Sequence, residues 1–396
     1  MTDSLQASES RCVHPHNSAI PAVPPAVVLV NLGTPQAPTP RAVRSFLREF
    51  LSDRRVIELH PILWRPILSM LLAVRPHTVA KKYASIWLEE GSPLMHYSLE
   101  QGRGVQEALG EGAVVRVAMR YGAPSLPTVL DELYQAGHRR VLVIPAYPQY
   151  TATCGATVVD EAARWLLTTR DHMELRTVRS FPTSPAYIEA LATALEEHWA
   201  RVGRPDFAAG ERVIASFHSI PAAMHNAGDP YRSECEATTA RLVKRLGIPA
   251  EGLITTYQSV FGPAEWIGPA TIDTVEELGS KQCSRVDVIC PGFVSDCLET
   301  LEEIDEQNRE AFAHHGGGEF HYVQWGNDSA GCVAAFAEQA RAALAGWGCF
   351  PAQQEMVDDV PAAASASAAA ASGACMCETQ VSGAEPLARA QVPVGS

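Results

Sequence analysis

The sequence predicts an α/β fold in which parallel β-strands are covered by helices on both faces. Short runs rich in Val, Ile and Leu alternate along the chain with longer stretches of helical period. Most of these runs are continuously apolar, which is typical of strands buried on both faces of a parallel sheet. The chain has 396 residues, enough for two or three domains of about 100–200 residues each.

Eight runs are predicted to be strands, because each is short and apolar and ends in polar, Gly or Pro residues. In chain order they cover residues 26–32, 114–119, 140–146, 175–181, 213–217, 253–257, 286–290 and 320–323. Their alternation with helices is typical of a doubly wound architecture. Eight strands could close into one barrel or form two open four-stranded sheets, and the periodicity does not decide between these arrangements.

Seven amphipathic stretches are predicted to be helices. They cover residues 41–50, 125–136, 157–169, 185–201, 231–246, 296–314 and 329–347. Pro185 fits the first turn of a helix after Ser184, and Asp229 before Pro230 is a suitable N-cap. The apolar segment 62–74 is also expected to be helical.

The composition argues against several classes of protein. The 31 basic and 45 acidic residues give a net charge of −14, which disfavours nucleic acid as a partner. The most apolar stretch, 62–74, is interrupted by Arg65 and Pro66 and is shorter than the ~20 apolar residues that cross a bilayer. Residues 1–24 lack a basic segment followed by an apolar one, so we expect no export signal and a cytoplasmic protein.

Both ends of the chain are predicted to be tails. Residues 1–24 are polar and expected to be disordered, and residues 349–396 form a low-complexity segment rich in Ala, Ser and Gly. Cys349, Cys375 and Cys377 are the candidate ligands for a 2Fe–2S cluster. Their spacing is irregular and such a cluster needs about four thiolates, so we expect no permanent cofactor.

Polar and aromatic residues follow the predicted strands of both halves, at the edge where open α/β sheets bind ligands. The candidate substrate-binding residues in these segments are Asn31, Thr34, Arg120, Tyr121, Tyr150 and Trp266. A cleft between two lobes would bring such strand ends together.

His218 directly follows the predicted strand 213–217 and is the first candidate for catalysis. A histidine at this point could be a hydrogen-bonded core residue. Its place at a strand end favours a functional role, because an imidazole there can accept a proton or bind a metal.

The predicted helix that opens at Asp296 is strongly acidic, and Glu299, Glu303 and Gln307 recur in it every four residues. Such a face could simply be solvated, with acids favoured near the helix N-terminus. Widening one turn to π geometry would instead stack the three side chains, and π-bulges concentrate at functional sites. Hard oxygen ligands that lead to an imidazole suit Fe²⁺ in transit, with His218 and Glu299 as its ligands.

The segment 62–74 carries large apolar side chains, among them Trp64, Leu68 and Met70. They could be core residues. They could also form a lip that receives a flat hydrophobic ligand or contacts a membrane surface transiently. Phosphate-binding and zinc-protease motifs are absent from the sequence.

Together these residues resemble the ferrochelatases, the enzymes that insert Fe²⁺ into a porphyrin to make haem. The matching motifs, in the family's order, are Asn-Leu-Gly-Thr-Pro at 31–35, Gly-Ser-Pro-Leu at 91–94, Arg-Tyr at 120–121, Tyr-Pro-Gln-Tyr at 147–150, Ser-Phe-His-Ser-Ile-Pro at 216–221, Gly-Asp-Pro-Tyr at 228–231, Gln-Ser at 258–259 with Gly-Pro at 262–263 and Trp-Ile-Gly-Pro at 266–269, and Pro-Gly-Phe-Val-Ser-Asp-Cys-Leu-Glu-Thr-Leu at 291–301. Each motif is weak alone, but their shared order makes coincidence improbable.

The resemblance implies two Rossmann-like lobes, each a parallel four-stranded sheet flanked by helices, with a porphyrin cleft between them. The first lobe, with the porphyrin lip, would comprise residues 25–178 and 322–348, and the second would comprise residues 179–321. The resemblance also implies that His218 and Glu299 face each other across the macrocycle. His218, Glu299 and Glu303 would be catalytic, with the two acids on a π-helix. Gln307 departs from the acid that many relatives carry at its position.

The implied reaction inserts Fe²⁺ into protoporphyrin IX and yields protohaem and two protons, the last step of haem biosynthesis. Relatives that act on protoporphyrin IX typically carry Asn-Leu-Gly-Thr-Pro, as at 31–35, whereas the coproporphyrin type usually has Tyr before that Gly. The alternatives are a coproporphyrin ferrochelatase, a cobalt or nickel chelatase of a related tetrapyrrole, and a non-catalytic haem carrier. We expect a monomer whose contact with a membrane surface is at most transient.

Overall fold

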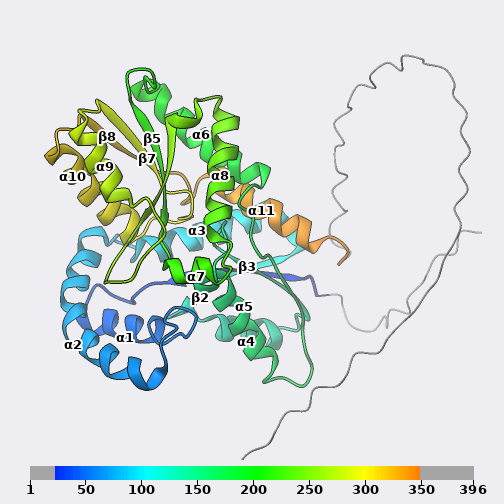
Figure 1. The fold of residues 1–396 in the computed structure, drawn as a ribbon. Helices are drawn as coiled ribbons and strands as arrows, with labels where there is room; N and C mark the ends of the chain where they lie inside the picture. Colours follow the sequence, from blue (N-terminus) through cyan, green and yellow to red (C-terminus); the bar gives the residue numbers. More distant parts are fainter. Residues whose placement is uncertain (1–22, 348–396) are drawn as a thin grey trace, which may run out of the picture. The chain divides into compact units, whose positions relative to one another are not determined.

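The strands form two separate open sheets, each with four parallel strands (Figure 1). The computed structural model describes residues 23–347. The first sheet has the order β2-β1-β3-β4, with β1 (Ala26–Gly33), β2 (Val114–Tyr121), β3 (Arg140–Pro145) and β4 (Glu174–Thr177). The second has the order β6-β5-β7-β8, with β5 (Arg212–His218), β6 (Leu253–Gln258), β7 (Arg285–Ile289) and β8 (Glu319–Val323). The two sheets repeat one strand order, so the predicted two-lobe α/β fold is confirmed and the barrel is excluded.

Helices cover both faces of each sheet. Those of the first half are α1 (Pro40–Phe50), α2 (Pro61–Ile86), α3 (Pro93–Leu109), α4 (Leu126–Gln135) and α5 (Thr157–Leu166). Those of the second half are α6 (Pro185–Val202), α7 (Ala222–Asn226), α8 (Tyr231–Leu246), α9 (Thr271–Ser280), the π-helix η4 (Glu299–Asn308), α10 (Arg309–His314) and α11 (Ala330–Leu344). Three short helical segments complete the set: η1 (Gly110–Gly112), η2 (Ala152–Ala156) and η3 (Ala250–Gly252). The side chain of Ser184 accepts a hydrogen bond from the Tyr187 N–H, which satisfies one of the free donors at the start of α6.

The sequence patterns miss three α-helices, α3, α7 and α9, and shorten α2, which continues to Ile86. Two glycines inside α3 lower its helix propensity. Close tertiary contacts explain why glycine occurs at these two positions. A Cβ on Gly102 would lie 2.5 Å from a methyl of Val117, and one on Gly104 would lie 2.6 Å from a methyl of Val333. These glycines therefore let α3 pack closely against β2 and α11.

The two sheets share one hydrophobic core, which α6 and α11 complete. Buried side chains of both sheets belong to it, for example Val27 of β1 and Val213 of β5, together with Leu195 of α6 and Phe336 of α11. The predicted return to the first lobe at residue 322 is wrong, because β8 pairs with β7 as far as Val323. Helix α11 then packs back toward the first lobe, against α3 and β3.

The end of the fourth strand also differs from the prediction. The fourth strand was expected to reach residue 181 but ends at Thr177, and Phe181 packs into the shared core from the segment that follows. The predicted tails lie outside the described residues, except for residues 23 and 24. The three cysteines considered for an iron–sulfur cluster lie outside them as well.

The carboxyl ends of β1 and β2 approach each other closely at Gly33. This residue has φ of +112°, and a Cβ at this position would lie only 1.8 Å from the carbonyl oxygen of Tyr121. Glycine is the residue that tolerates both conditions. It therefore allows the Asn31–Thr34 turn to lie directly against the end of β2.

Candidate functional site

His218 lies at the carboxyl end of β5, and the chain fixes the tautomer of its ring. Its Nδ1 is 2.6 Å from the carbonyl oxygen of Ser219. Because a carbonyl oxygen only accepts, Nδ1 carries the hydrogen and the neutral ring keeps its lone pair on Nε2. Ser219 is held in turn, since its N–H donates to the Gln258 carbonyl at 2.8 Å and its hydroxyl to the Ile267 carbonyl at 2.9 Å. The His218 ring is thus oriented with Nε2 free to accept a proton or bind a metal.

The end of β6 connects this histidine to the π-helix. The side-chain amide of Gln258 donates to the Glu299 carbonyl oxygen at 2.7 Å and accepts from the Ser216 hydroxyl at 2.8 Å. Ser259 has a left-handed backbone, with φ of +65°. Its N–H and hydroxyl both donate to the Glu303 carboxylate, at 2.6 and 2.5 Å. A left-handed backbone is unfavourable for a residue other than glycine, and such strained residues are common at functional sites.

The acidic segment does adopt π geometry, from Glu299 to Asn308. The pKa of Glu303 responds to the charges of Glu299 and His218, so these three side chains interact electrostatically. Gln307 does not extend their line, because its side chain is exposed and donates to Glu302 at 2.7 Å. The π geometry considered from the four-residue spacing is therefore confirmed, whereas the third member of the line points elsewhere.

Burial raises the pKa of Glu303 above its ordinary value of 4.5, and the charge of Glu299 raises it further. The hydrogen bonds from Ser259 and the positive form of His218 oppose this shift. A carboxyl group with a raised pKa holds a proton more readily than a solvated one. Glu303 is therefore suited to proton transfer.

Asp296, predicted to open the acidic helix, instead lies before it and is buried. Its carboxylate accepts hydrogen bonds from four side chains: Tyr322 at 2.5 Å, Gln324 at 2.9 Å, Asn327 at 2.7 Å and Thr300 at 2.8 Å. With its oxygens engaged, Asp296 anchors the start of the π-helix to the segment after β8.

Asn31 and Thr34, two predicted substrate contacts, lie where the first lobe meets the second. The Asn31 amide donates to the Ser98 hydroxyl at 3.0 Å and, across the lobes, to the Ser295 hydroxyl at 3.4 Å. The Thr34 hydroxyl donates to the Ser92 hydroxyl at 2.8 Å. Both residues are buried, and their hydrogen bonds hold the end of β1 against α3 and the segment that leads into η4.

Tyr83 of α2 belongs to this region, and the sequence analysis missed it. Burial raises the pKa of its hydroxyl well above 10, and the nearby charges of Glu299 and Cys297 raise it further. A tyrosine with a raised pKa stays neutral and can donate a hydrogen bond. The only signal in the sequence is its place on a helix after an apolar segment, which does not reveal its neighbours.

Arg120 and Tyr121, also predicted to bind substrate, are buried and engaged by Asp53. An Arg120 NH2 group lies 2.5 Å from an Asp53 carboxylate oxygen, and the Tyr121 hydroxyl donates to the same oxygen at 3.0 Å. Burial is the largest cause of the strongly raised pKa of Tyr121. Either side chain would have to leave Asp53 before it could bind a ligand.

Tyr150 and Trp266 are half-buried aromatic residues in loops. The Arg179 guanidinium lies 4.3 Å from the centre of the Tyr150 ring. The Trp266 indole donates to the Phe261 carbonyl at 3.0 Å, and the two rings lie 4.9 Å apart. The Arg75 guanidinium of α2 lies 5.8 Å from the Phe261 ring, so the Trp266 loop lies beside α2.

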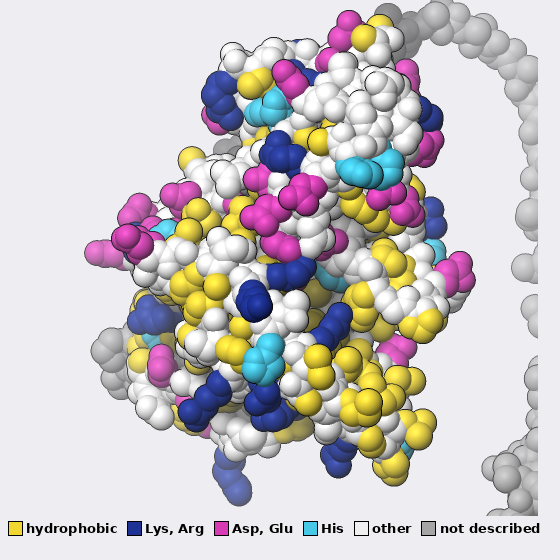
Figure 2. Space-filling model, turned by 90° about the vertical axis from the view of Figure 1, so that its left-hand side faces the viewer, with side chains coloured by type: hydrophobic (Ala, Val, Ile, Leu, Met, Phe, Trp, Pro, Cys, Tyr) yellow, Lys and Arg dark blue, Asp and Glu magenta, His cyan; other side chains and the backbone are white. Residues whose placement is uncertain are grey.

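The predicted apolar lip is exposed only in part, because Met70 is exposed whereas Leu68 is buried in the core and Trp64 is half-buried. Figure 2 shows hydrophobic side chains gathered on the face to which α2 contributes. The exposed apolar residues of α2 and of the neighbouring loop are Ile62, Leu63, Ile67, Met70, Val74, Val260 and Phe261. Lys82 at the other end of α2 forms an ion pair with Glu302 of the π-helix at 2.7 Å. Within residues 23–347, no helix combines the length and apolar character that a membrane span requires.

The arrangement can therefore perform two kinds of chemistry. The free Nε2 of His218 and the oxygens of Glu299 and Glu303 are suitable ligands for a divalent first-row metal. The same groups can accept protons from a bound molecule. Three neighbouring residues link the segments that carry these groups: Ser219 holds the His218 ring and pairs with Gln258, Gln258 contacts the Glu299 backbone, and Ser259 holds the Glu303 carboxylate.

Comparison with known proteins agrees with this fold. A family model described as Ferrochelatase matches residues 24–344. SirB from Bacillus subtilis with Fe³⁺ is similar with a TM-score of 0.50 and 12% identity, over 81% of this chain and 96% of that chain. SirB from Bacillus subtilis subspecies spizizenii in complex with cobalt gives a TM-score of 0.47 and 10% identity, over 81% and 95% of the two chains. At 12% identity, the match with a TM-score of 0.50 shows a similar fold and nothing more.

Proposed function

Because the chain belongs to the ferrochelatase family and is thus a tetrapyrrole metal chelatase, we propose that it inserts Fe²⁺ into protoporphyrin IX. The products are protohaem and two protons, as in the last step of haem biosynthesis. The observation that carries this proposal is the free Nε2 of His218, on a ring whose charge acts on Glu303, as that of Glu299 does.

The proton balance of insertion assigns roles to these residues. A free-base porphyrin carries two N–H protons, and both must leave when the dication takes their place. His218 accepts one at Nε2, because Nδ1 already donates to the Ser219 carbonyl. The carboxylate of Glu303 is the second acceptor, and its raised pKa lets it hold that proton.

Glu299 and His218 also bind Fe²⁺ before it enters the ring, and Nε2 of His218 accepts its proton once the ion has moved from it into the macrocycle. An imidazole and a carboxylate make a mixed donor set that suits a metal of intermediate softness. Two protein ligands are fewer than a permanent structural site uses. The ion can therefore leave again, as a substrate ion must. The Glu299 backbone is fixed by Gln258, so its side chain is presented from a defined point on the π-helix.

The porphyrin would lie between the strand ends and the exposed apolar side chains of α2 and the Val260–Phe261 loop. Asn31, Thr34, Tyr150 and Trp266 remain its predicted contacts. Apolar walls supply binding free energy that can bend the ring and so open it to the metal. Arg120 and Tyr121 would act at longer range, through Asp53, unless this contact opens.

Protoporphyrin IX is the proposed substrate for two reasons. The turn at 31–35 has the Asn-Leu-Gly-Thr-Pro sequence without a Tyr before Gly33. In addition, the apolar side chains of α2 suit vinyl and methyl groups better than the four propionates of coproporphyrin. Turnover of the purified chain with each porphyrin and Fe²⁺ tests this, and a preference for coproporphyrin would overturn it.

The rival functions are separated by one absorbance assay. A haem carrier would bind haem and form none from Fe²⁺ and free porphyrin, and it has no use for a buried carboxylate near the histidine. A cobalt or nickel chelatase would turn over those metals and a different tetrapyrrole, and commonly has a second histidine where this chain has Glu299. We expect rapid insertion with Fe²⁺ and protoporphyrin IX.

We also propose transient contact with a membrane surface through α2. Leu63, Ile67, Met70 and Val74 recur at intervals of four, three and four, so they lie on one helix face, and all are exposed. Sedimentation with lipid vesicles should recover the wild-type chain. The Leu63→Ser/Met70→Ser variant should stay in the supernatant, and equal recovery would contradict the proposal.

A further inference from the structure

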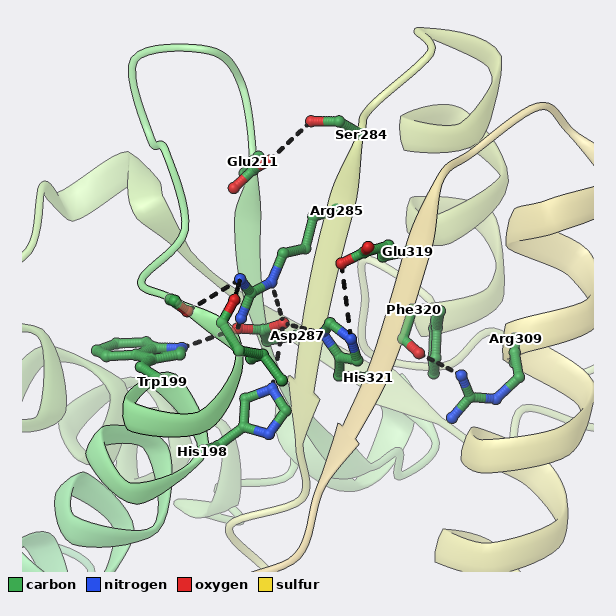
Figure 3. A network of polar contacts seen from close by, with 12 residues as sticks. His198, Trp199, Glu211, Ser284, Arg285, Asp287, Arg309, Glu319, Phe320 and His321 are labelled. Carbon is green, nitrogen blue, oxygen red and sulfur yellow. Dashed lines mark hydrogen bonds and ion pairs between the residues drawn. The ribbon is translucent and has the colours of Figure 1, made fainter.

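A second cluster of metal-binding side chains lies in the second lobe (Figure 3). His198 comes from α6, Asp287 from β7 and His321 from β8, and one ligand atom from each lies within 4.8 Å of the other two. Asp287 and His321 face each other in the register of the two strands. Residues far apart in the sequence thus place two imidazoles and one carboxylate around one point.

This cluster is separate from the proposed insertion site. Asp287 pairs with Val213 of β5, five residues before His218 on the same strand. At about 3.3 Å per residue, His218 lies about 16 Å further along the sheet. The proposed chemistry of insertion uses none of the three residues.

Asp287 is the centre of the cluster and is fully buried. One carboxylate oxygen lies 2.9 Å from Nδ1 of His321, and the other accepts from the Trp199 indole at 2.8 Å. Arg285 donates to both oxygens at 2.8 Å. The carboxylate is therefore held rigidly, with the oxygen nearer to His321 directed at the two imidazoles.

His198 supplies the observation that points to a ligand. Its Nε2 is buried and has no hydrogen-bond partner. It lies 3.7 Å from the nearer Asp287 oxygen, beyond hydrogen-bond distance, and the His198 and His321 rings lie 4.9 Å apart. A buried polar atom without a partner costs free energy, and a cation between these groups would remove that cost.

We propose that His198, Asp287 and His321 form a binding site for a divalent first-row metal ion such as Zn²⁺. The ligand atoms are Nε2 of His198, the nearer oxygen of Asp287 and Nδ1 of His321. In a tetrahedral zinc shell, neighbouring ligand atoms lie about 3.3 Å apart. The two separations from the Asp287 oxygen, 2.9 and 3.7 Å, bracket that value. Three protein ligands leave the fourth position for water.

Glu319 lies beside His321 and is placed to orient its ring. Its carboxylate lies 3.8 Å from Nε2 of His321. The dashed line between the two side chains in Figure 3 marks this ion pair. When Nδ1 binds the metal, the proton of the neutral ring resides on Nε2, where Glu319 can accept a hydrogen bond from it. A carboxylate behind a metal-bound histidine fixes the tautomer and strengthens the ligand. Glu319 is largely exposed and His321 partly so, which places this side of the cluster at the solvent-facing edge of the sheet.

Arg285 opposes the bound cation. Its guanidinium contacts both oxygens of Asp287 and repels a second positive charge nearby. The site should therefore bind zinc with lower affinity than a three-ligand set without a neighbouring cation. Arg285→Gln should tighten binding, a result that a purely structural ion pair would not give.

The test is zinc binding by the purified full chain, measured by equilibrium dialysis in a His218→Ala background that removes the other proposed metal ligand. His198→Gln and His321→Gln should each lose one equivalent of Zn²⁺, whereas His172→Gln, at an exposed histidine, should lose none. Glu319→Gln should weaken binding about tenfold. Equal stoichiometry in all variants would overturn the proposal.

Two further measurements guard against a variant that fails to fold. Co²⁺ in place of Zn²⁺ should give the visible absorption bands of a low-symmetry nitrogen–oxygen site in the His218→Ala chain, and these bands should vanish in His321→Gln. Zn²⁺ should raise the melting temperature of the His218→Ala chain and leave that of the His321→Gln chain unchanged. If the bands or the zinc-dependent stabilisation persist in His321→Gln, the cluster is not the site.

Discussion

The backbone N–H and the hydroxyl of Ser259 both donate to the Glu303 carboxylate, at 2.6 and 2.5 Å. Ser259 reaches this position only with a left-handed backbone, at φ of +65°. These two donors stabilise the ionised form of Glu303 and so lower its pKa, against the burial that raises it. Ser259 is therefore the hydrogen-bonding partner that most favours release of a proton from Glu303.

Ser259→Ala should lower the rate of iron insertion about tenfold, because it removes a hydrogen bond to a charged group worth ~1.5 kcal/mol. Loss of that bond raises the pKa of Glu303, so the acid limb of the pH–rate profile should move to higher pH. Steady-state kinetics across the pH range measures both effects. Ser85→Ala, at an exposed serine of α2, is the control. An unshifted acid limb in Ser259→Ala would exclude this role.

His218→Ala should lower the insertion rate at least about a hundredfold while the porphyrin still binds, because the variant lacks a proton acceptor and a metal ligand. Stopped-flow absorbance measures insertion, and quenching of porphyrin fluorescence measures binding. His172→Ala, at an exposed histidine, should leave both unchanged. Normal turnover in His218→Ala would remove the histidine from the mechanism.

Glu303→Gln should make the protein more stable near neutral pH and less active. The pKa of Glu303 is raised by burial, so the folded chain binds its proton more tightly than the unfolded chain does. Its contribution to stability is therefore complete below about 4.5, the ordinary value, and is lost as pH rises through the folded pKa. Denaturant unfolding at several pH values should show a gap between variant and wild type that widens as pH increases.

The matched control for this measurement is Glu306→Gln, which removes an exposed acid from the same π-helix. Its stability difference from the wild type should stay nearly constant with pH. A gap that narrows with rising pH in Glu303→Gln would show that the ionised carboxylate is favoured in the fold.

Asp53→Ala should destabilise the protein by about 3–5 kcal/mol, because it leaves the Arg120 guanidinium buried without its closest partner. Arg120 and Asp53 are each only 8% exposed. Asp171→Ala breaks the exposed ion pair with Arg139 and should cost less than about 1 kcal/mol. Similar losses in the two variants, measured by denaturant unfolding, would contradict the buried character of the Arg120 pair.

The sequence predicted those parts of the fold and site that depend on local pattern. The eight strands follow from continuous apolar runs, and the π geometry was suggested by the four-residue interval between Glu299 and Glu303. The partners of these acids could not be predicted, because Ser259 comes from a strand end 44 residues earlier in the chain. Helix α3 was likewise not predicted, because its two glycines disfavour a helix in the sequence pattern. They are needed for close packing against β2 and α11, which only the structure shows.

The cluster around Asp287 was missed for the same reason. His198, Asp287 and His321 stand in three different elements, with no spacing that resembles a metal motif. Asp287 in the middle of an apolar strand was the only local irregularity, and its neighbours are determined by the order of β7 and β8 in the sheet.

The core that both sheets share limits how the molecule can move. Helices α6 and α11 fill the space between the sheets with apolar side chains, so a wide hinge opening would expose that interior to water. A macrocycle would then enter and leave when peripheral segments such as α2 and the Trp266 loop move aside. The two sheets and their shared core would stay in place. The rates of substrate entry and product release would thus depend on the flexibility of these peripheral segments.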